Sequence, residues 1–275
     1  MPGMLRSVLI AALIASNARA QKVLLELRPH AGDTLRMELE QITEMSSAAN
    51  GATPTKVITS LRMFSRAIVE STAHIASLIL AVTDSVDVNS SDPRARELAE
   101  QAERDLEGRQ MRLRLWPDGT VTLNDGAASV PREVSDLVSV MPASFPSRPV
   151  QVGDMWVREM PVPSSESVGI PTGSVVRTRF RFDSISPEGD LAYLSMAGAL
   201  RPVAATPANE GLAGSVSGSL VVDRQRGWLS ESHFLLQLRS TLARKGALRD
   251  EAVKFSVRVT QTMHVLQPAS IARRR

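Results

Sequence analysis

The 275-residue chain contains no cysteine, and this absence excludes several kinds of site. Disulfide bridges and lipid attachment at a bacterial lipobox both need a cysteine side chain, so neither is possible here. Zinc sites built on cysteine are excluded too, and the four histidines do not have the spacing of metal-ligand pairs. These histidines are His30, His74, His233 and His264. We therefore expect no metal and no other cofactor, and a fold stabilised by its core alone.

The sequence also lacks the short motifs of common catalytic sites. It has no glycine-rich phosphate loop followed by lysine, and no dinucleotide-binding fingerprint. In the glycine- and serine-rich segment 214–219, Val216 stands where a nucleophilic serine would be needed. Acidic pairs such as Glu38 and Glu40 have the spacing of a solvated strand face. We expect a non-enzymatic protein with no catalytic residue.

The chain begins with a short apolar run that is not long enough for a membrane helix, which needs about 20 apolar residues. Residues 1–20 combine Arg6, the apolar run 7–15 and a small-x-small site that ends at Ala20. This is the three-part pattern of a secretory signal peptide. We expect cleavage near Ala20 and an exported protein, periplasmic or secreted, with no stable membrane anchor. An uncleaved anchor and an ordinary buried helix are the alternatives.

Little charge of one sign remains in the mature chain. The full sequence has 32 Lys and Arg residues, and loss of Arg6 and Arg19 leaves 30 against 29 Asp and Glu residues. Because phosphate backbones are bound by clustered basic side chains, we expect no nucleic-acid partner. One local exception is a run of three arginines at spacing two, Arg177, Arg179 and Arg181. This run is typical of a solvated strand face, and an anion site is the alternative.

What the mature chain does contain is alternation of apolar and polar residues, the period-two pattern of half-buried strands. In the segment 35–40, Leu35, Met37 and Leu39 alternate with charged residues. Similar patterns recur in the segments 57–64, 74–82, 111–123, 177–182, 219–238 and 253–263. We expect a mainly β protein with minor α content: a large curved antiparallel sheet or half-barrel with one or two covering helices.

Two segments carry helical signals. In the segment 93–107, Asp92 occupies the N-cap position, Pro93 the first turn and Gly108 the stop. Its apolar stripe is narrow, so we expect this helix to lie on the surface. A second short helix is expected from residue 131 to 140.

We expect one β-rich domain over residues 21–267, followed by a disordered basic tail at 268–275. The parts 21–142 and 143–267 begin alike, because Gly32-Asp33 and Gly153-Asp154 each precede an expected strand. This similarity leads to the hypothesis that the domain consists of two related halves.

Several methionines and phenylalanines lie on the expected inner stripes. Flexible thioethers suit cavities that accept varied apolar ligands, and they also fill ordinary cores. The candidate ligand-binding residues are Met37, Met63, Phe180, Phe182 and Phe255. A concave wall without facing side chains would favour a ligand site, whereas a tightly filled interior would count against one.

The order of these features resembles that of a group of uncharacterised exported bacterial proteins. More distantly, it is similar to the lipoprotein-carrier (LolA-like) half-barrels of the bacterial envelope. The features are the signal peptide, the Gly-Asp-led strand, a long meander, a helical insertion, the segment 149–156 and the hairpin 218–229.

In that family an open, curved sheet is capped by helices, and its apolar concavity holds acyl chains. The resemblance implies a lid formed by 93–107 and 131–141, and a lipid or lipoprotein as partner. The alternative is a structural or protein-interaction module with a filled core, which binds an envelope protein.

Overall fold

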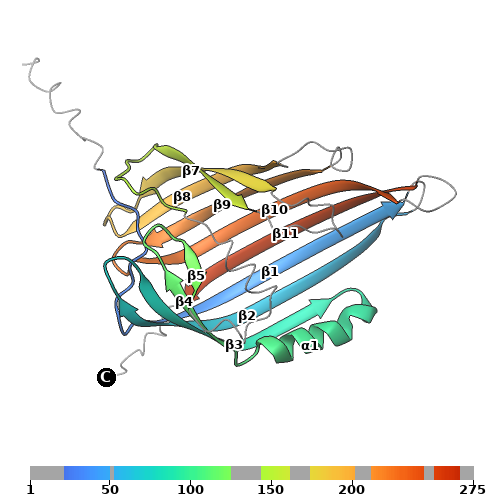
Figure 1. Ribbon diagram of the computed structural model, residues 1–275, viewed down its shortest axis with the longest axis horizontal. Coiled ribbons are helices and arrows are strands. Elements are labelled where there is room, and N and C mark those ends of the chain that lie inside the picture. Colours follow the sequence, from blue (N-terminus) through green and yellow to red (C-terminus); the bar gives the residue numbers. More distant parts are fainter. Residues whose placement is uncertain are drawn as a thin grey trace, which may run out of the picture.

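The computed structural model describes residues 22–49, 53–124, 144–161, 174–201, 212–244 and 251–266. These residues form a single antiparallel sheet of eleven strands with one α-helix, so the predicted fold class is confirmed (Figure 1). The strands are β1 (Thr34–Ala49), β2 (Thr55–Thr72), β3 (Ser77–Ser90), β4 (Gln110–Leu115), β5 (Val121–Leu123), β6 (Met155–Pro161), β7 (Val175–Ile185), β8 (Leu191–Arg201), β9 (Ala213–Asp223), β10 (Trp228–Arg244) and β11 (Glu251–Leu266).

The first and last strands of the chain meet in the middle of the sheet. The strand order is β5-β4-β3-β2-β1-β11-β10-β9-β8-β7-β6. Strands β1 and β11 pair from Arg36 opposite Leu266 to Ala49 opposite Val253, while the other pairs join strands adjacent in sequence. In the described part of the chain, β5 and β6 are therefore the two edges of a sheet that does not close into a barrel.

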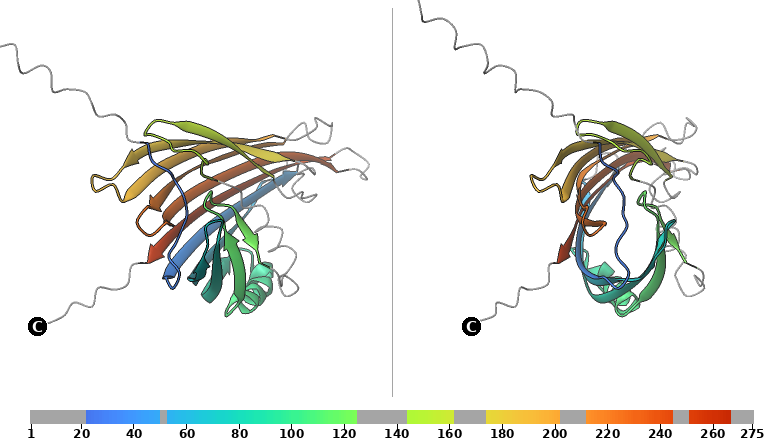
Figure 2. Two further views of the ribbon diagram at one scale, coloured as in Figure 1. Left: turned by 60° about the vertical axis from the view of Figure 1, so that its left-hand side comes forward. Right: turned by 90° about the vertical axis from the view of Figure 1, so that its left-hand side faces the viewer.

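The sheet curves strongly, as the two views in Figure 2 show. Its concave side, here called the inner face, carries Leu35, Leu194 and Val222. Glycines on this face of β8 and β9 permit close packing where a side chain would collide. A Cβ at Gly218 would lie 2.2 Å from the carbonyl oxygen of His233, and one at Gly198 would lie 2.7 Å from that of Arg177. Glycines inside strands often mark such bends.

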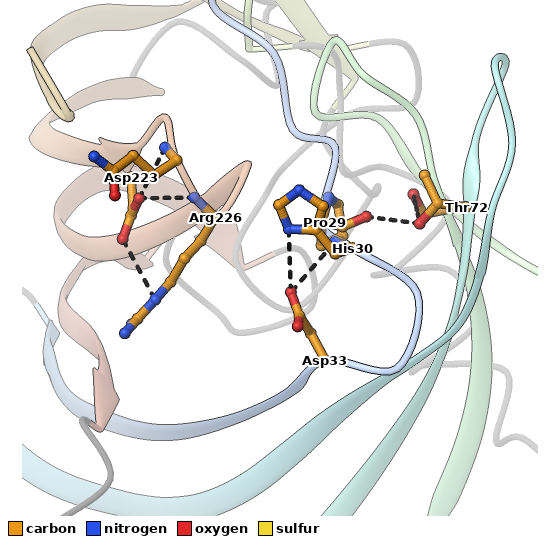
Figure 3. A network of polar contacts seen from close by, with 8 residues as sticks. Pro29, His30, Asp33, Thr72, Asp223 and Arg226 are labelled. Atoms are coloured by element: carbon orange, nitrogen blue, oxygen red, sulfur yellow. Dashed lines mark hydrogen bonds and ion pairs between the residues drawn. The ribbon is translucent and has the colours of Figure 1, made fainter.

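An extended segment, residues 22–31, crosses one end of the curved sheet and is here called the strap (blue in Figure 2). Its backbone bonds to turns that are far apart in sequence (Figure 3 shows the Pro29 contact). The bonds are Val23 with Val150 in both directions, Leu27 N to Pro117 O, Arg28 N to Gly227 O, and Thr72 Oγ1 to Pro29 O. The strap thus connects the turns at this end of the sheet by hydrogen bonds, and we call this end the closed end.

The main hydrophobic core lies under the strap. Leu25 is 1% exposed, and Phe145, just before β6, is also 1% exposed. They pack with inner-face residues from both ends of the strand order, including Ile79 of β3 and Phe182 of β7. Because aliphatic and aromatic side chains fill this end, the closed end is a packed core rather than an open cavity.

The helix α1 (Arg96–Leu106) lies along β3, beside the part that follows its pairing with β4 (Figure 1), after the 3₁₀ turn η1 (Pro93–Ala95). Asp92 caps that turn, accepting a bond from Arg94 N at 3.0 Å. Glu103 Oε1 accepts a bond from Val88 N of β3 at 2.7 Å, and Leu98 is 72% exposed. The predicted surface helix is confirmed. It does not cover the inner face, so it is not positioned as the lid that the resemblance implies.

The second predicted helix, 131–140, and the corresponding lid segment lie outside the described residues, as do the signal segment 1–20 and the tail 268–275. In the part of the chain that the structure describes, no helix has the length and apolar character needed to span a membrane.

The two Gly-Asp turns have the same hydrogen bonds. His30 N and Gln151 N donate to the Oδ2 of Asp33 and Asp154, at 3.3 and 3.0 Å. In return, Asp33 N donates to the carbonyl oxygen of His30 at 3.1 Å, and Asp154 N donates to that of Gln151 at 3.0 Å. The preceding glycines, at φ of 90° and 94°, adopt a conformation that glycine tolerates best.

The equivalence of the turns extends into the next strands. Gly32 N bonds to Val69 O of β2, and Gly153 N bonds to Phe182 O of β7, at 2.9 and 2.7 Å. A β-bulge follows directly after both Val69 and Phe182. The parts therefore share a local geometry at their beginnings, while the hypothesis of two related halves stays a prediction.

Candidate ligand-binding surface

Beyond the core, the inner face continues along the far parts of β2, β1, β11 and β10. Strand register and the period-two alternation of side chains place matching rows of residues on this face. Each row runs from β2 through β1 and β11 to β10. In order along the strands, the four rows are Met63, Leu39, Met263 and Ser232; Leu61, Gln41, Gln261 and Phe234; Thr59, Thr43, Val259 and Leu236; and Val57, Met45, Val257 and Leu238.

Most side chains in these rows are apolar and partly exposed rather than buried. Met45, in the last row, is 38% exposed. We call this region the open half of the inner face. It differs from the closed end, where the strap covers the sheet. An apolar face of this kind can bind a hydrophobic molecule by burying its surface.

All five candidate ligand-binding residues lie on the inner face, but in different surroundings. Phe182 is 0% and Phe180 2% exposed, and Met37 packs against the main core cluster. Met63 and Phe255 are partly exposed in the open half, opposite Leu39 and Ser47 respectively.

Phe182 belongs to the cluster under the strap, and Phe180 stacks on Trp156 with centroids 5.9 Å apart and planes 7° from parallel. These two side chains are therefore part of the packed interior. The role of the five residues as ligand contacts stays a prediction, and the geometry favours Met63 and Phe255 for it.

Sequence reasoning did not single out Arg158 of β6. Its strand neighbour Trp156 packs against the core, so alternation puts Arg158 on the inner face as well. Among the described strand side chains, every other charged residue lies on the outer face, at a bulge or at a strand end. The signal in the sequence is that Arg158 stands two positions after Trp156, because residues at this spacing in a strand face the same side.

Arg158 is paired in register with Thr178 of β7. Its Nη2 donates a 2.5 Å bond to the carbonyl oxygen of Phe145, whereas its buried Nε has no partner. Thr178 is 0% exposed, and its Oγ1 also has no partner. Two unsatisfied polar groups thus lie on neighbouring strands of the inner face, next to an apolar cluster.

The outer face is polar and carries ion pairs between adjacent strands. Arg66 makes a bidentate contact with Asp84, at 2.8 and 3.0 Å. Lys56 bonds to Glu44 at 2.8 Å, and this hydrogen bond lowers the pKa of the Glu44 carboxyl. Exposed pairs of this kind contribute little stability.

The three arginines of β7 lie on this outer face. Arg177 is 3.8 Å from Glu159, and Arg181 is 3.5 Å from Asp183. Arg179 lies between them, opposite Val157 of the edge strand β6. These contacts fit a solvated strand face better than an anion site. Among the described residues, no group of three or more His, Asp or Glu side chains is arranged to hold a metal ion.

Comparisons with known proteins show no family for this chain. No protein-family model matches the sequence, and no curated protein matches it. Among solved structures, a lipovitellin structure that describes lipid-protein interactions has a TM-score of 0.47 at 9% identity, over 88% of this chain. This chain spans only 26% of the lipovitellin chain.

Two bacterial structures are similar at lower scores. OccK11 (OpdR) of Pseudomonas aeruginosa has a TM-score of 0.24 at 8% identity, over 90% of this chain and all (100%) of that one. The LolA superfamily protein NE2245 of Nitrosomonas europaea has a TM-score of 0.15 at 9% identity, over 89% of this chain and 91% of that one. The structural neighbours thus include a LolA superfamily protein and a lipid-associated protein, without any evidence of a shared sequence family.

Proposed function

We propose that this chain is an exported, non-enzymatic protein of the bacterial envelope that binds a hydrophobic or amphiphilic ligand, such as a lipid or a lipoprotein acyl chain. The observation that carries the proposal is the open half of the inner face. Its apolar side chains on four adjacent strands stay partly exposed, while the closed end is covered by the strap.

Apolar surface that remains accessible in a folded protein usually marks an interaction site. Covering it contributes about 25 cal/mol for each Å² of apolar area removed from water. The rows of the open half include a bulky residue on each strand, such as Leu61 on β2 and Leu236 on β10. An acyl chain lying along these rows would gain this burial without needing any charged partner.

The test measures lipid directly. Mature protein purified from the envelope is extracted and analysed by mass spectrometry, and the delipidated protein is titrated with a fluorescent fatty acid. We expect a co-purifying lipid and saturable binding of the probe. Absence of both would contradict the proposal.

A matched pair of variants on β11 locates the binding face. Val259 lies on the inner face opposite Thr43, and its neighbour Thr260 lies on the outer face opposite Ile42. We expect Val259→Glu to abolish probe binding, because it places a charge in the apolar surface, and Thr260→Glu to leave binding unchanged. Equal loss in both variants would mean that the inner face is not the binding surface.

A second candidate function is protein interaction in the envelope, and the edge strand β6 favours it. Met155 is 58% and Val157 40% exposed on its outer face, next to Arg181 and Arg179 of β7. Exposed apolar residues on an edge strand are a common site for pairing with another chain. A photo-crosslinker at position 157 should then capture one envelope protein reproducibly, and a crosslinker at position 98 of α1 should not.

A further inference from the structure

The inner face carries one charge among the described strand side chains, and it belongs to Arg158. A guanidinium remains protonated at any physiological pH. Burying such a charge without a counter-ion is costly, so buried arginines are normally paired with carboxylates or phosphates. Within the described residues Arg158 has no acidic partner, because its recorded bond goes to the neutral carbonyl of Phe145. Among the described residues, no carboxylate is paired with this partly buried charge.

The neighbouring Thr178 adds a second unsatisfied donor. Cross-strand partners in an antiparallel sheet have their Cβ atoms about 5 Å apart, so the Arg158 and Thr178 side chains lie next to each other. The Arg158 Nε–H and the Thr178 hydroxyl are both hydrogen-bond donors without a recorded partner. Hydrogen bonds from such groups to an anionic oxygen are about twice as strong as those between neutral groups.

An apolar cluster lies beside this pair on the same face. Val176, Leu200 and Val216 are at most 9% exposed, and Phe234 of β10 packs against them. Phe234 also belongs to the open half, where it lies opposite Gln261. The inner face therefore continues without a charged side chain from the Arg158 and Thr178 pair into the open half.

We propose that Arg158 and Thr178 form the binding site for the anionic head of an amphiphile, a carboxylate or a phosphate, whose hydrocarbon tail extends along the inner face toward Phe234. This inference rests on the proposed function and makes it more specific, because it requires an acidic lipid rather than any apolar molecule. Arg158 supplies the charge, and Thr178 positions the anion by a second hydrogen bond.

The experiment compares two probes that share one tail. Delipidated mature protein is titrated at pH 8 with cis-parinaric acid, which is intrinsically fluorescent, and with its uncharged methyl ester. We expect the acid to bind at least about tenfold more tightly than the ester, as a charge-assisted contact implies. A further titration adds millimolar inorganic phosphate, which should leave the acid bound because phosphate has no tail.

Variants test whether the difference in affinity between the acid and the ester depends on Arg158 and Thr178. Arg158→Gln and Thr178→Val should each weaken binding of the acid toward that of the ester, and should leave binding of the ester unchanged. Arg179→Gln is the control, since Arg179 is adjacent to Thr178 in β7 and lies on the outer face. It should change neither affinity.

Thr178→Val also separates a ligand role from a structural one. Valine has nearly the shape of threonine and removes a buried hydroxyl that has no partner, so the melting temperature should stay equal or rise. Retained stability with selective loss of acid binding supports the site even if Arg158→Gln fails to fold.

Other outcomes would overturn the inference. Equal binding of acid and ester by the unmodified protein, or equal loss of both probes in Thr178→Val, would each contradict the anion site while leaving the proposed function in place. Displacement of the acid by phosphate would contradict the amphiphile as the ligand of this site and indicate a site for free anions. If neither probe binds, both the anion site and the proposed function are contradicted.

Discussion

Gly227, in the turn between β9 and β10, lies in close contact with the strap. A Cβ there would lie 2.3 Å from the carbonyl oxygen of Arg28, and its φ is +61°. We expect Gly227→Ala to destabilise the protein by more than the cost of about 1 to 3 kcal/mol for an unfavourable φ alone, because the strap must also move. Urea denaturation measures this cost.

Gly189, in the turn between β7 and β8, is the matched control for that substitution. Its φ is +78°, but the nearest atom to an added Cβ is a flexible arginine end at 3.9 Å. We therefore expect Gly189→Ala to lower the unfolding free energy only by the cost of the unfavourable φ. If the two variants lose the same free energy of unfolding, the close approach of the strap contributes nothing to stability.

Asp190, in the same turn, provides a test of pH dependence. The hydrogen bond from Ser186 Oγ holds the pKa of the Asp190 carboxyl below its usual value. A carboxylate with a lowered pKa in the folded state stabilises the fold above its unfolded pKa of about 4, and this stabilisation is lost as the pH falls through the folded value. Ser186→Ala should raise the Asp190 pKa, as measured by NMR titration.

The pH dependence of the unfolding free energy should agree with the lowered pKa of Asp190. The difference in unfolding free energy between the unmodified protein and Ser186→Ala should be constant near neutral pH and become smaller below about pH 4. Ser186 Oγ also accepts a bond from Leu191 N at 3.0 Å, so part of the difference should persist in acid. A difference that grows on acidification would refute this account.

At the scale of single elements, the strap offers a direct comparison between neighbouring leucines. Leu25 is 1% exposed in the main core, whereas Leu24 is 45% exposed on the other side of the same extended segment. Leu25→Ala should cost about 2 to 5 kcal/mol, as truncation of a buried leucine does. Leu24→Ala should change stability by no more than about 0.5 kcal/mol. If Leu25→Ala and Leu24→Ala lower the unfolding free energy equally in urea denaturation, the strap does not contribute to the core.

Local patterns in the sequence were sufficient to predict most of the regular elements. Alternation around Leu35 and Met37 marked β1, and the helical signals between Asp92 and Gly108 marked α1, because both depend on residues close together in the chain. The strap could not be predicted in the same way. Its backbone bonds are to turns such as those at Pro117 and Gly227, and no local pattern encodes such distant partners.

The same limit applies to the candidate site. Alternation correctly grouped Phe180 with Phe182 and Met63 with Leu61 on common faces. It could not say which part of that face the strap fills and which part stays open. Nor could it reveal that Arg158 faces inward beside Thr178, because that depends on the pairing of β6 with β7.

At the scale of the whole molecule, the pairing of β1 with β11 determines how the protein must assemble. Each half of the chain alone would leave one side of this long central ladder unpaired, from Arg36 to Ala49 or from Val253 to Leu266. The strap and the segment before β6 also cross between the halves, since Val23 bonds to Val150 and Phe145 N bonds to Asp118 O. Unpaired strand edges of this kind promote aggregation.

We therefore expect fragments 22–124 and 144–266, produced as separate chains in one cell, to form a soluble one-to-one complex, and each fragment alone to aggregate. Size-exclusion chromatography with multi-angle light scattering and circular dichroism would measure both results. Deletion of 251–266 from the second fragment is the matched control, because it removes β11 and should prevent association with β1. If either fragment alone is monomeric and folded, the two parts are independent domains, and the single-domain interpretation is wrong.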